Sequence, residues 1–123
     1  MPTRRIAREG DAAYAEIFKH FSGIPEHLVA AVRKIVEEQR ESTPGIKFGD
    51  IYAEAISEII SAHTGTGEPV VWLASVRGGD STKVSLWLRE ETAEELERFS
   101  RQVHRSQSAV VGTALDRYLK KRS

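Results

Sequence analysis

Cysteine is absent from this sequence, which excludes disulfide bonds and thiolate metal sites. No apolar run approaches the ~20 residues that a membrane-spanning helix needs, and no basic-then-apolar segment of the kind that marks a secretory signal opens the chain. Net charge is lacking too, because 18 basic side chains balance 18 acidic ones. These absences favour a cytoplasmic protein with no membrane partner, and the charge balance by itself indicates no class of ligand.

The composition that remains is typical of a folded globular protein, with 40% hydrophobic and 29% charged residues. A chain of 123 residues is long enough for one compact domain with its own core. The four histidines are scattered without ligand spacing, so no metal site is expected. We find no nucleophile with a base beside it and no glycine-rich phosphate loop, so we expect neither an enzyme nor a cofactor.

The first half of the chain has the pattern of a strand followed by two helices. Residues 1–13 show no periodicity and are expected to form a flexible arm. The apolar-aromatic residues within 14–24 predict a strand, and Pro25 suits the first position of a helix over about 25–40. A break at residues 42–45 precedes a second helix, whose apolar face contains Phe48, Ile51, Tyr52, Ala55, Ile56, Ile59 and Ile60.

The second half repeats that order. In the predicted strand 83–88, the apolar residues Val84, Leu86 and Leu88 alternate with Lys83, Ser85 and Trp87, so one face is apolar and the other is available for contacts. A third helix with an acidic first turn follows, and a turn at residues 104–106 leads into a fourth. Ser106 or Ser108 is expected to cap the fourth helix.

The two halves align as an internal repeat. In the first helix of each half, Val32 pairs with Leu96 at an offset of 64 residues. In the second helix of each half, Ile59 pairs with Leu119 at an offset of 60. The first half therefore has four extra residues in its turn.

The second half resembles the ribbon-helix-helix family of the Arc and MetJ repressors. The matching features are the alternating strand, the short acidic helix, the Arg105-Ser106 turn and a helix with apolar residues four apart. The first half resembles the helical part of that family, but its strand departs from the pattern, because His20 and Ser22 stand where apolar residues are expected. The tandem arrangement is similar to the single-chain ribbon-helix-helix virulence proteins that assist T-DNA transfer in agrobacteria.

This resemblance implies an α+β, mainly α fold in which two tandem units form one pseudo-dimer. The units would cover residues 14–62 and 82–123 of one compact fold, with a linker over 63–81. Their strands would pair antiparallel into a ribbon over four helices, and fusion would make the protein a monomer, because the second unit is always present at high effective concentration.

The resemblance also implies residues that contact double-stranded DNA. Base readout in the major groove would come from Lys83, Ser85 and Trp87, with Lys19 and Phe21 as the corresponding residues of the first strand. Phosphates would be bound at the starts of the second helices. The candidates there are Arg105, Ser106, Gln107, Ser108 and Lys47.

The same residues also have simpler, purely structural interpretations. Lys83 and Ser85 could be the solvated face of a half-buried strand, and Ile17, Phe18 and Phe21 could belong to the core. Trp87 could be covered by a third strand from the β-rich residues 70–76.

Three functions are compatible with this interpretation. The first is an accessory factor in plasmid or T-DNA processing and transfer, for which other DNA-processing or relaxosome proteins are candidate partners. The second is a transcriptional repressor of the same fold. The third is a protein-interaction scaffold or antitoxin-like module without strong DNA binding, which the zero net charge favours.

Overall fold

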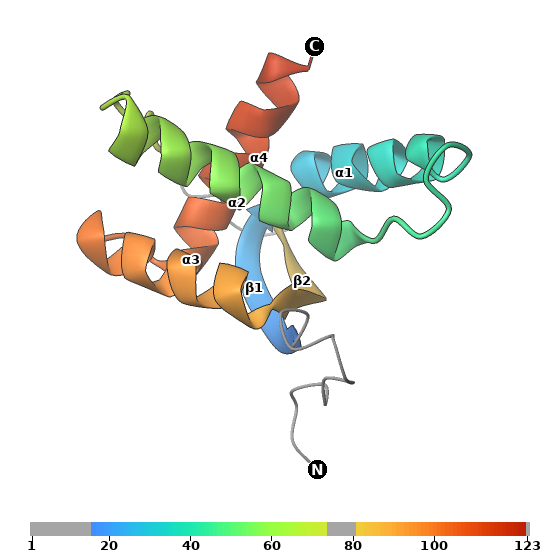
Figure 1. Ribbon diagram of the computed structural model, residues 1–123, viewed down its shortest axis with the longest axis horizontal. Helices are drawn as coiled ribbons and strands as arrows, with labels where there is room; N and C mark the ends of the chain where they lie inside the picture. The colour runs from blue at the N-terminus through green and yellow to red at the C-terminus, as the bar shows by residue number, and fades with distance from the viewer. Residues whose placement is uncertain (1–15, 74–80, 123) are drawn as a thin grey trace.

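The computed structural model describes residues 16–73 and 81–122, so the expected arm at residues 1–13 lies outside the described part. The described residues form an α+β, mainly helical fold with a two-stranded antiparallel sheet and four helices (Figure 1). In chain order the elements are β1 (Glu16–Pro25), α1 (Glu26–Gln39), α2 (Phe48–Gly65), β2 (Ser81–Arg89), α3 (Glu90–Gln102) and α4 (Gln107–Lys121).

The sheet joins the two halves of the chain. β1 and β2 pair antiparallel, with His20 opposite Ser85 near the middle and Glu16 opposite Arg89 at one end. The predicted pairing of the two strand segments is therefore confirmed. The register shifts between Phe21 and Ile24, where Gly23 has a φ of +73°. A glycine in this left-handed conformation is a common way to build a β-bulge.

The helices lie around the strands and bury one stripe of apolar residues each. In Figure 1, α1 and α3 flank the strands on opposite sides, and α2 crosses α4. The four helices and the inner face of the sheet share one core, to which α2 contributes Ile51, Tyr52, Ala55, Ile56 and Ile59 and α4 contributes Val110, Val111, Ala114, Leu115 and Tyr118. None of the described helices is both long enough and apolar enough to cross a lipid bilayer.

The starts of α1 and α4 agree with the sequence pattern to within a residue or so. Pro25 is the last residue of β1, and α1 begins at Glu26, one residue later than predicted. The backbone of Pro25 is still extended (ψ 129°), as suits a residue that ends a strand. Ser106 caps α4, its hydroxyl accepting a hydrogen bond from the Ala109 N–H at 3.0 Å, so this prediction is confirmed.

The two interhelical turns differ in length as the repeat predicts. The turn from α1 to α2 covers residues 40–47, and the turn from α3 to α4 covers residues 103–106. The first is thus four residues longer. His104 in the shorter turn has a φ of +57°, the left-handed conformation in which a helix often ends.

The segment expected as a linker over 63–81 begins within α2, and its described part packs on α4. α2 continues to Gly65, and residues 66–73 run along α4. The Glu68 carboxylate accepts hydrogen bonds from Arg117, and the Leu73 N–H donates to the Thr113 hydroxyl at 3.2 Å. Residues 70–73 do not join the sheet, and residues 74–76 of the alternative third strand lie outside the described part. The described part of this segment packs on α4 instead.

Candidate nucleic-acid interface

One face of the β1–β2 sheet packs on the helices, and the other is open among the described residues. Inward-facing Phe21, Ile24, Leu86 and Leu88 are all buried. Their strand neighbours point the opposite way, because successive side chains of a strand alternate between its faces. We name this opposite side the outer face. Its central residues are Phe18, His20, Lys83, Ser85 and Trp87, all of which are exposed.

Three of the predicted readout residues lie where the sequence placed them. Lys83, Ser85 and Trp87 share the outer face, and Trp87 is 41% exposed, so the described chain does not cover it. The Ser85 hydroxyl is already engaged, since Ser85 Oγ lies 2.7 Å from Nδ1 of His20. Either atom can donate this hydrogen bond, depending on the tautomer of the imidazole. Among these central outer-face residues, Lys83 thus has the longest charged side chain.

The expected outward orientation of Lys19 and Phe21 is wrong. Phe21 is 1% exposed and belongs to the core, and Lys19 lies half-buried on the same inward-facing side, opposite Leu86. The bulge is the physical reason. Both strands run directly into their helices, but β1 has one more residue than β2, and the bulge at Ser22–Gly23 accommodates it. The residues of β1 before the bulge are therefore shifted by one position relative to α1, and a shift of one residue exchanges the two faces of a strand.

Phe18 and His20 hold the outward positions instead, and sequence reasoning missed both as site residues. Two signals could have found them. His20 and Ser22 disagreed with the inward pattern, and Gly23 supplied the residue type that a bulge requires. With one residue skipped at Gly23, Phe18 corresponds to Lys83 and His20 to Ser85.

The outer face has an aromatic centre. The rings of Phe18 and Trp87 pack across the strands with centroids 5.0 Å apart and planes tilted by 48°. The His20 ring meets Phe18 edge-on at 4.9 Å. Phe18 remains 38% exposed and Trp87 41% exposed despite these contacts. The site therefore presents exposed ring surface together with one ammonium group, a combination that the alternating pattern of β2 alone did not predict.

The start of α4 lies beside the bulge of β1. The Ser108 hydroxyl accepts a hydrogen bond from the Ser22 N–H at 3.2 Å, which places the first turn of α4 against the strand. Arg105 and Ser106 are exposed, and Gln107 is half-buried. The Arg105 guanidinium lies over the Trp72 ring, 5.2 Å from its centroid, so residues 66–73 also reach this end of α4. The four residues predicted to bind phosphate here are consecutive in the sequence, and the fold places them at the start of α4 beside β1.

The start of α2 has a different chemistry. The Asp50 carboxylate accepts a hydrogen bond from the Lys47 N–H at 2.9 Å, and this acidic group adds negative charge at the positive end of the helix. Phe48, 40% exposed, stands where the repeat places Ser108 in α4. Lys47 is exposed beside them. This helix start is therefore less suited to a phosphate than that of α4.

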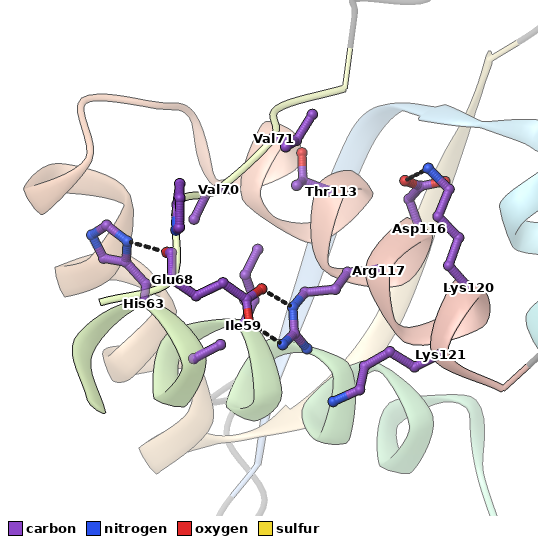
Figure 2. A pocket seen from close by; sticks show the side chains of 12 residues that line it. Ile59, His63, Glu68, Val70, Val71, Thr113, Asp116, Arg117, Lys120 and Lys121 are labelled. Atoms are coloured by element: carbon purple, nitrogen blue, oxygen red, sulfur yellow. Dashed lines mark hydrogen bonds and ion pairs between the residues drawn. The ribbon is translucent and has the colours of Figure 1, made fainter. Parts of the chain in front are cut away.

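A pocket of about 510 Å³ lies away from the sheet, between α2, residues 68–71 and α4 (Figure 2). Four of its charged residues form two pairs. Arg117 donates to both oxygens of Glu68 at 3.1 and 3.2 Å, and the Lys120 ammonium lies 2.9 Å from the Asp116 carboxylate. The hydrogen bond from Arg117 lowers the pKa of Glu68. The Arg117–Glu68 pair holds residues 66–71 against α4, whereas the Lys120–Asp116 pair lies within α4, so both pairs have a structural role.

Within residues 16–73 and 81–122, no three histidine or acidic side chains gather closely enough to hold a metal ion. The comparisons with known proteins do not assign the chain: no family model, curated protein or solved structure matches it. The outer face of the sheet and the adjoining helix starts are the features from which a function can be inferred.

Proposed function

We propose that the chain consists of two ribbon-helix-helix units fused into one pseudo-dimer, and that it binds double-stranded DNA by inserting the β1–β2 ribbon into the major groove. One observation carries the proposal. Strands from the two halves of the chain pair antiparallel over a shared helical core, and Lys83 and Ser85 point away from that core.

The dimensions and local charge of the ribbon support this proposal. The major groove of B-DNA, about 12 Å wide, admits a two-stranded ribbon. On the outer side the strands have two cations, Lys83 and Arg89, against one acid, Glu16, although the whole chain is neutral. Lys83 can reach a guanine edge or a phosphate, and Ser85 can exchange its bond with His20 for one with a base.

The helix start at α4 would supply the phosphate contact. Backbone N–H groups in the first turn of a helix lack partners within the helix and attract anions. Arg105 adds a positive charge beside them. The start of α2 has Asp50 in the corresponding region, so phosphate would bind more strongly at the start of α4 than at the start of α2. Such a protein should prefer an asymmetric DNA site to a perfect palindrome.

For the cellular role, we propose an accessory factor in plasmid or T-DNA processing and transfer, acting with other DNA-processing or relaxosome proteins. Support for this role is the resemblance of the tandem arrangement to the single-chain virulence proteins. A transcriptional repressor of the same fold is the alternative within this proposal, and both roles would use the same contact between ribbon and DNA.

A second candidate is a protein-interaction scaffold or antitoxin-like module that keeps the fold without strong DNA affinity. Two observations favour it: the neutral net charge and the exposed rings of Phe18 and Trp87. Exposed aromatic side chains are common at the centres of protein interfaces.

A salt titration separates the two candidates. Binding of the protein to random-sequence duplex is measured by fluorescence anisotropy over a range of salt concentrations. A ribbon that neutralises ~4–6 phosphates predicts a slope of about −4 to −5 in a plot of log affinity against log salt. An absence of binding to duplex at low salt would contradict the DNA-binding proposal and favour the scaffold.

A further inference from the structure

The outer face exposes several aromatic rings but few groups that can form hydrogen bonds. Phe18, His20 and Trp87 form a contiguous aromatic group, with ring centroids 4.9 and 5.0 Å apart. The Ser85 hydroxyl is bonded to His20, which leaves Lys83 as the principal hydrogen-bond donor at the centre of the outer face. Reading the edges of paired bases depends on directed donors and acceptors. A face of this composition is poorly equipped for that task alone.

Aromatic side chains match a different surface of DNA, the flat face of a base. In a paired duplex these faces are stacked on one another and hidden, and they become available where bases are unpaired. Stacking on protein rings is then favourable for every base, because each has a π face. The ammonium group of Lys83, exposed on the outer face, would hold the sugar-phosphate backbone nearby.

We infer that the aromatic group of Phe18, His20 and Trp87 is a stacking site for unpaired DNA bases, so that the ribbon binds locally melted or single-stranded DNA more tightly than fully paired duplex. This inference rests on the proposed function and specifies its substrate. The rings of Phe18 and Trp87 are tilted relative to each other rather than parallel, so a base can pack on Trp87 without entering between them.

The first test compares three DNA probes of one sequence: a duplex, the same duplex with a central bubble of mismatched bases, and the single strand. We expect the bubble to bind roughly tenfold more tightly than the duplex, the scale of one or two stacked bases. Trp87→Ala should abolish this preference, Trp87→Phe should retain most of it, and both variants should melt near the parent temperature because Trp87 is 41% exposed.

The second test measures the stacking directly. Trp72 is the other tryptophan of the chain, so Trp72→Phe leaves Trp87 as the only indole fluorophore. Adding the single strand or the bubble should quench its emission, and adding intact duplex should quench it less. This measurement stays informative even if Trp87→Ala fails to fold.

The possible failures are distinguishable. If duplex and bubble bind equally and the emission of Trp87 does not change, the stacking inference is wrong while the proposed duplex binding stands. If no probe binds at low salt, the inference and the proposed function both fail. If Trp87→Ala folds normally and still prefers the bubble, the preference does not depend on Trp87, which overturns the stacking site.

Discussion

At Gly49 the start of α2 comes so close to β2 that an added Cβ atom would meet the carbonyl oxygen of Trp87. Because that neighbour is backbone, it cannot move aside without displacing the strand. We expect Gly49→Ala to lower the free energy of unfolding by about 1–3 kcal/mol, as overpacking does. Gly65→Ala is the matched control, since a Cβ there meets no atom within 4 Å.

Urea denaturation of both glycine variants measures this difference. Gly65→Ala should be neutral or slightly stabilising, because alanine reduces the conformational freedom of the unfolded chain. Equal stability of the two variants would show that α2 does not approach β2 this closely.

Because of Tyr52, we expect the protein to lose stability at alkaline pH. Burial raises the pKa of this phenol to about 12, against a usual value of 10. The unfolded chain therefore loses the Tyr52 proton at lower pH than the folded chain does. Stability from this group is complete below pH 10, falls as the pH rises from 10 to 12, and amounts to about 2–3 kcal/mol over that interval.

Tyr52→Phe tests this pH dependence, because phenylalanine has no proton to lose. The free energy of unfolding, measured from about pH 9 to about pH 12, should decline less steeply in the variant than in the parent. Burial also raises the pKa of Tyr118, so the variant should retain part of the decline. Identical slopes in parent and variant would contradict the buried position of Tyr52.

Among the site residues, those of β2 could be predicted and those of β1 could not. The alternation of Lys83, Ser85 and Trp87 with apolar residues fixes their face, because no irregularity interrupts β2. In β1, counting back from Pro25 fails, since the bulge at Gly23 exchanges inward and outward positions. Gly23 and the polar residues beside it signal a bulge, but its exact position depends on pairing with the other strand. The outward orientation of Phe18 and His20 is therefore fixed only by that pairing.

At the scale of elements, ion pairs join α2 to α4. Arg117 is 21% exposed and lies between Glu58 and Glu68, while Arg122 binds Glu54 and Glu58 and covers the Tyr118 ring at 3.5 Å. We expect Arg117→Ala to cost about 1–2 kcal/mol of stability, within the usual range for a point substitution. Loss of a fully buried partner costs more, but here Glu58 keeps its contact with Arg122.

Arg101→Ala is the control for Arg117→Ala. Arg101 pairs with Glu97 four residues earlier on α3, and its side chain is 73% exposed. An exposed pair of this kind contributes roughly 0.3–0.5 kcal/mol. Thermal or chemical denaturation should therefore show a larger loss of stability for Arg117→Ala than for Arg101→Ala. Equal losses would mean that the pairs between α2 and α4 are as solvated as those on the surface.

The helices were the most predictable elements. Apolar residues at helical spacing located all four described helices, and the caps and breaks located their ends to within a few residues, as Ser106 shows for α4. The structure of the segment after α2 was harder to predict, because residues 66–73 have no periodic pattern. Their order comes from contacts with α4, such as Leu73 with Thr113, which join residues 40 positions apart.

At the scale of the whole molecule, the two halves of the chain close on each other. The strands pair across the halves, α2 packs on α4, and the described helices and strands all contribute to one core. Since the pairing is within one chain, the melting temperature should not change over a roughly hundredfold range of protein concentration. A melting temperature that rises with concentration would show that the fold depends on association between chains.

The most direct test of the central claim, that the outer face of the ribbon binds DNA, is the affinity of Lys83→Ala/Ser85→Ala for duplex. The control is Lys34→Ala, which removes an exposed positive charge from α1. The ribbon variant should melt near the parent temperature and bind more weakly, by about 1–3 kcal/mol for each base that its side chains no longer reach, whereas the control should bind almost like the parent. A ribbon variant that binds duplex as tightly as the parent would contradict the account.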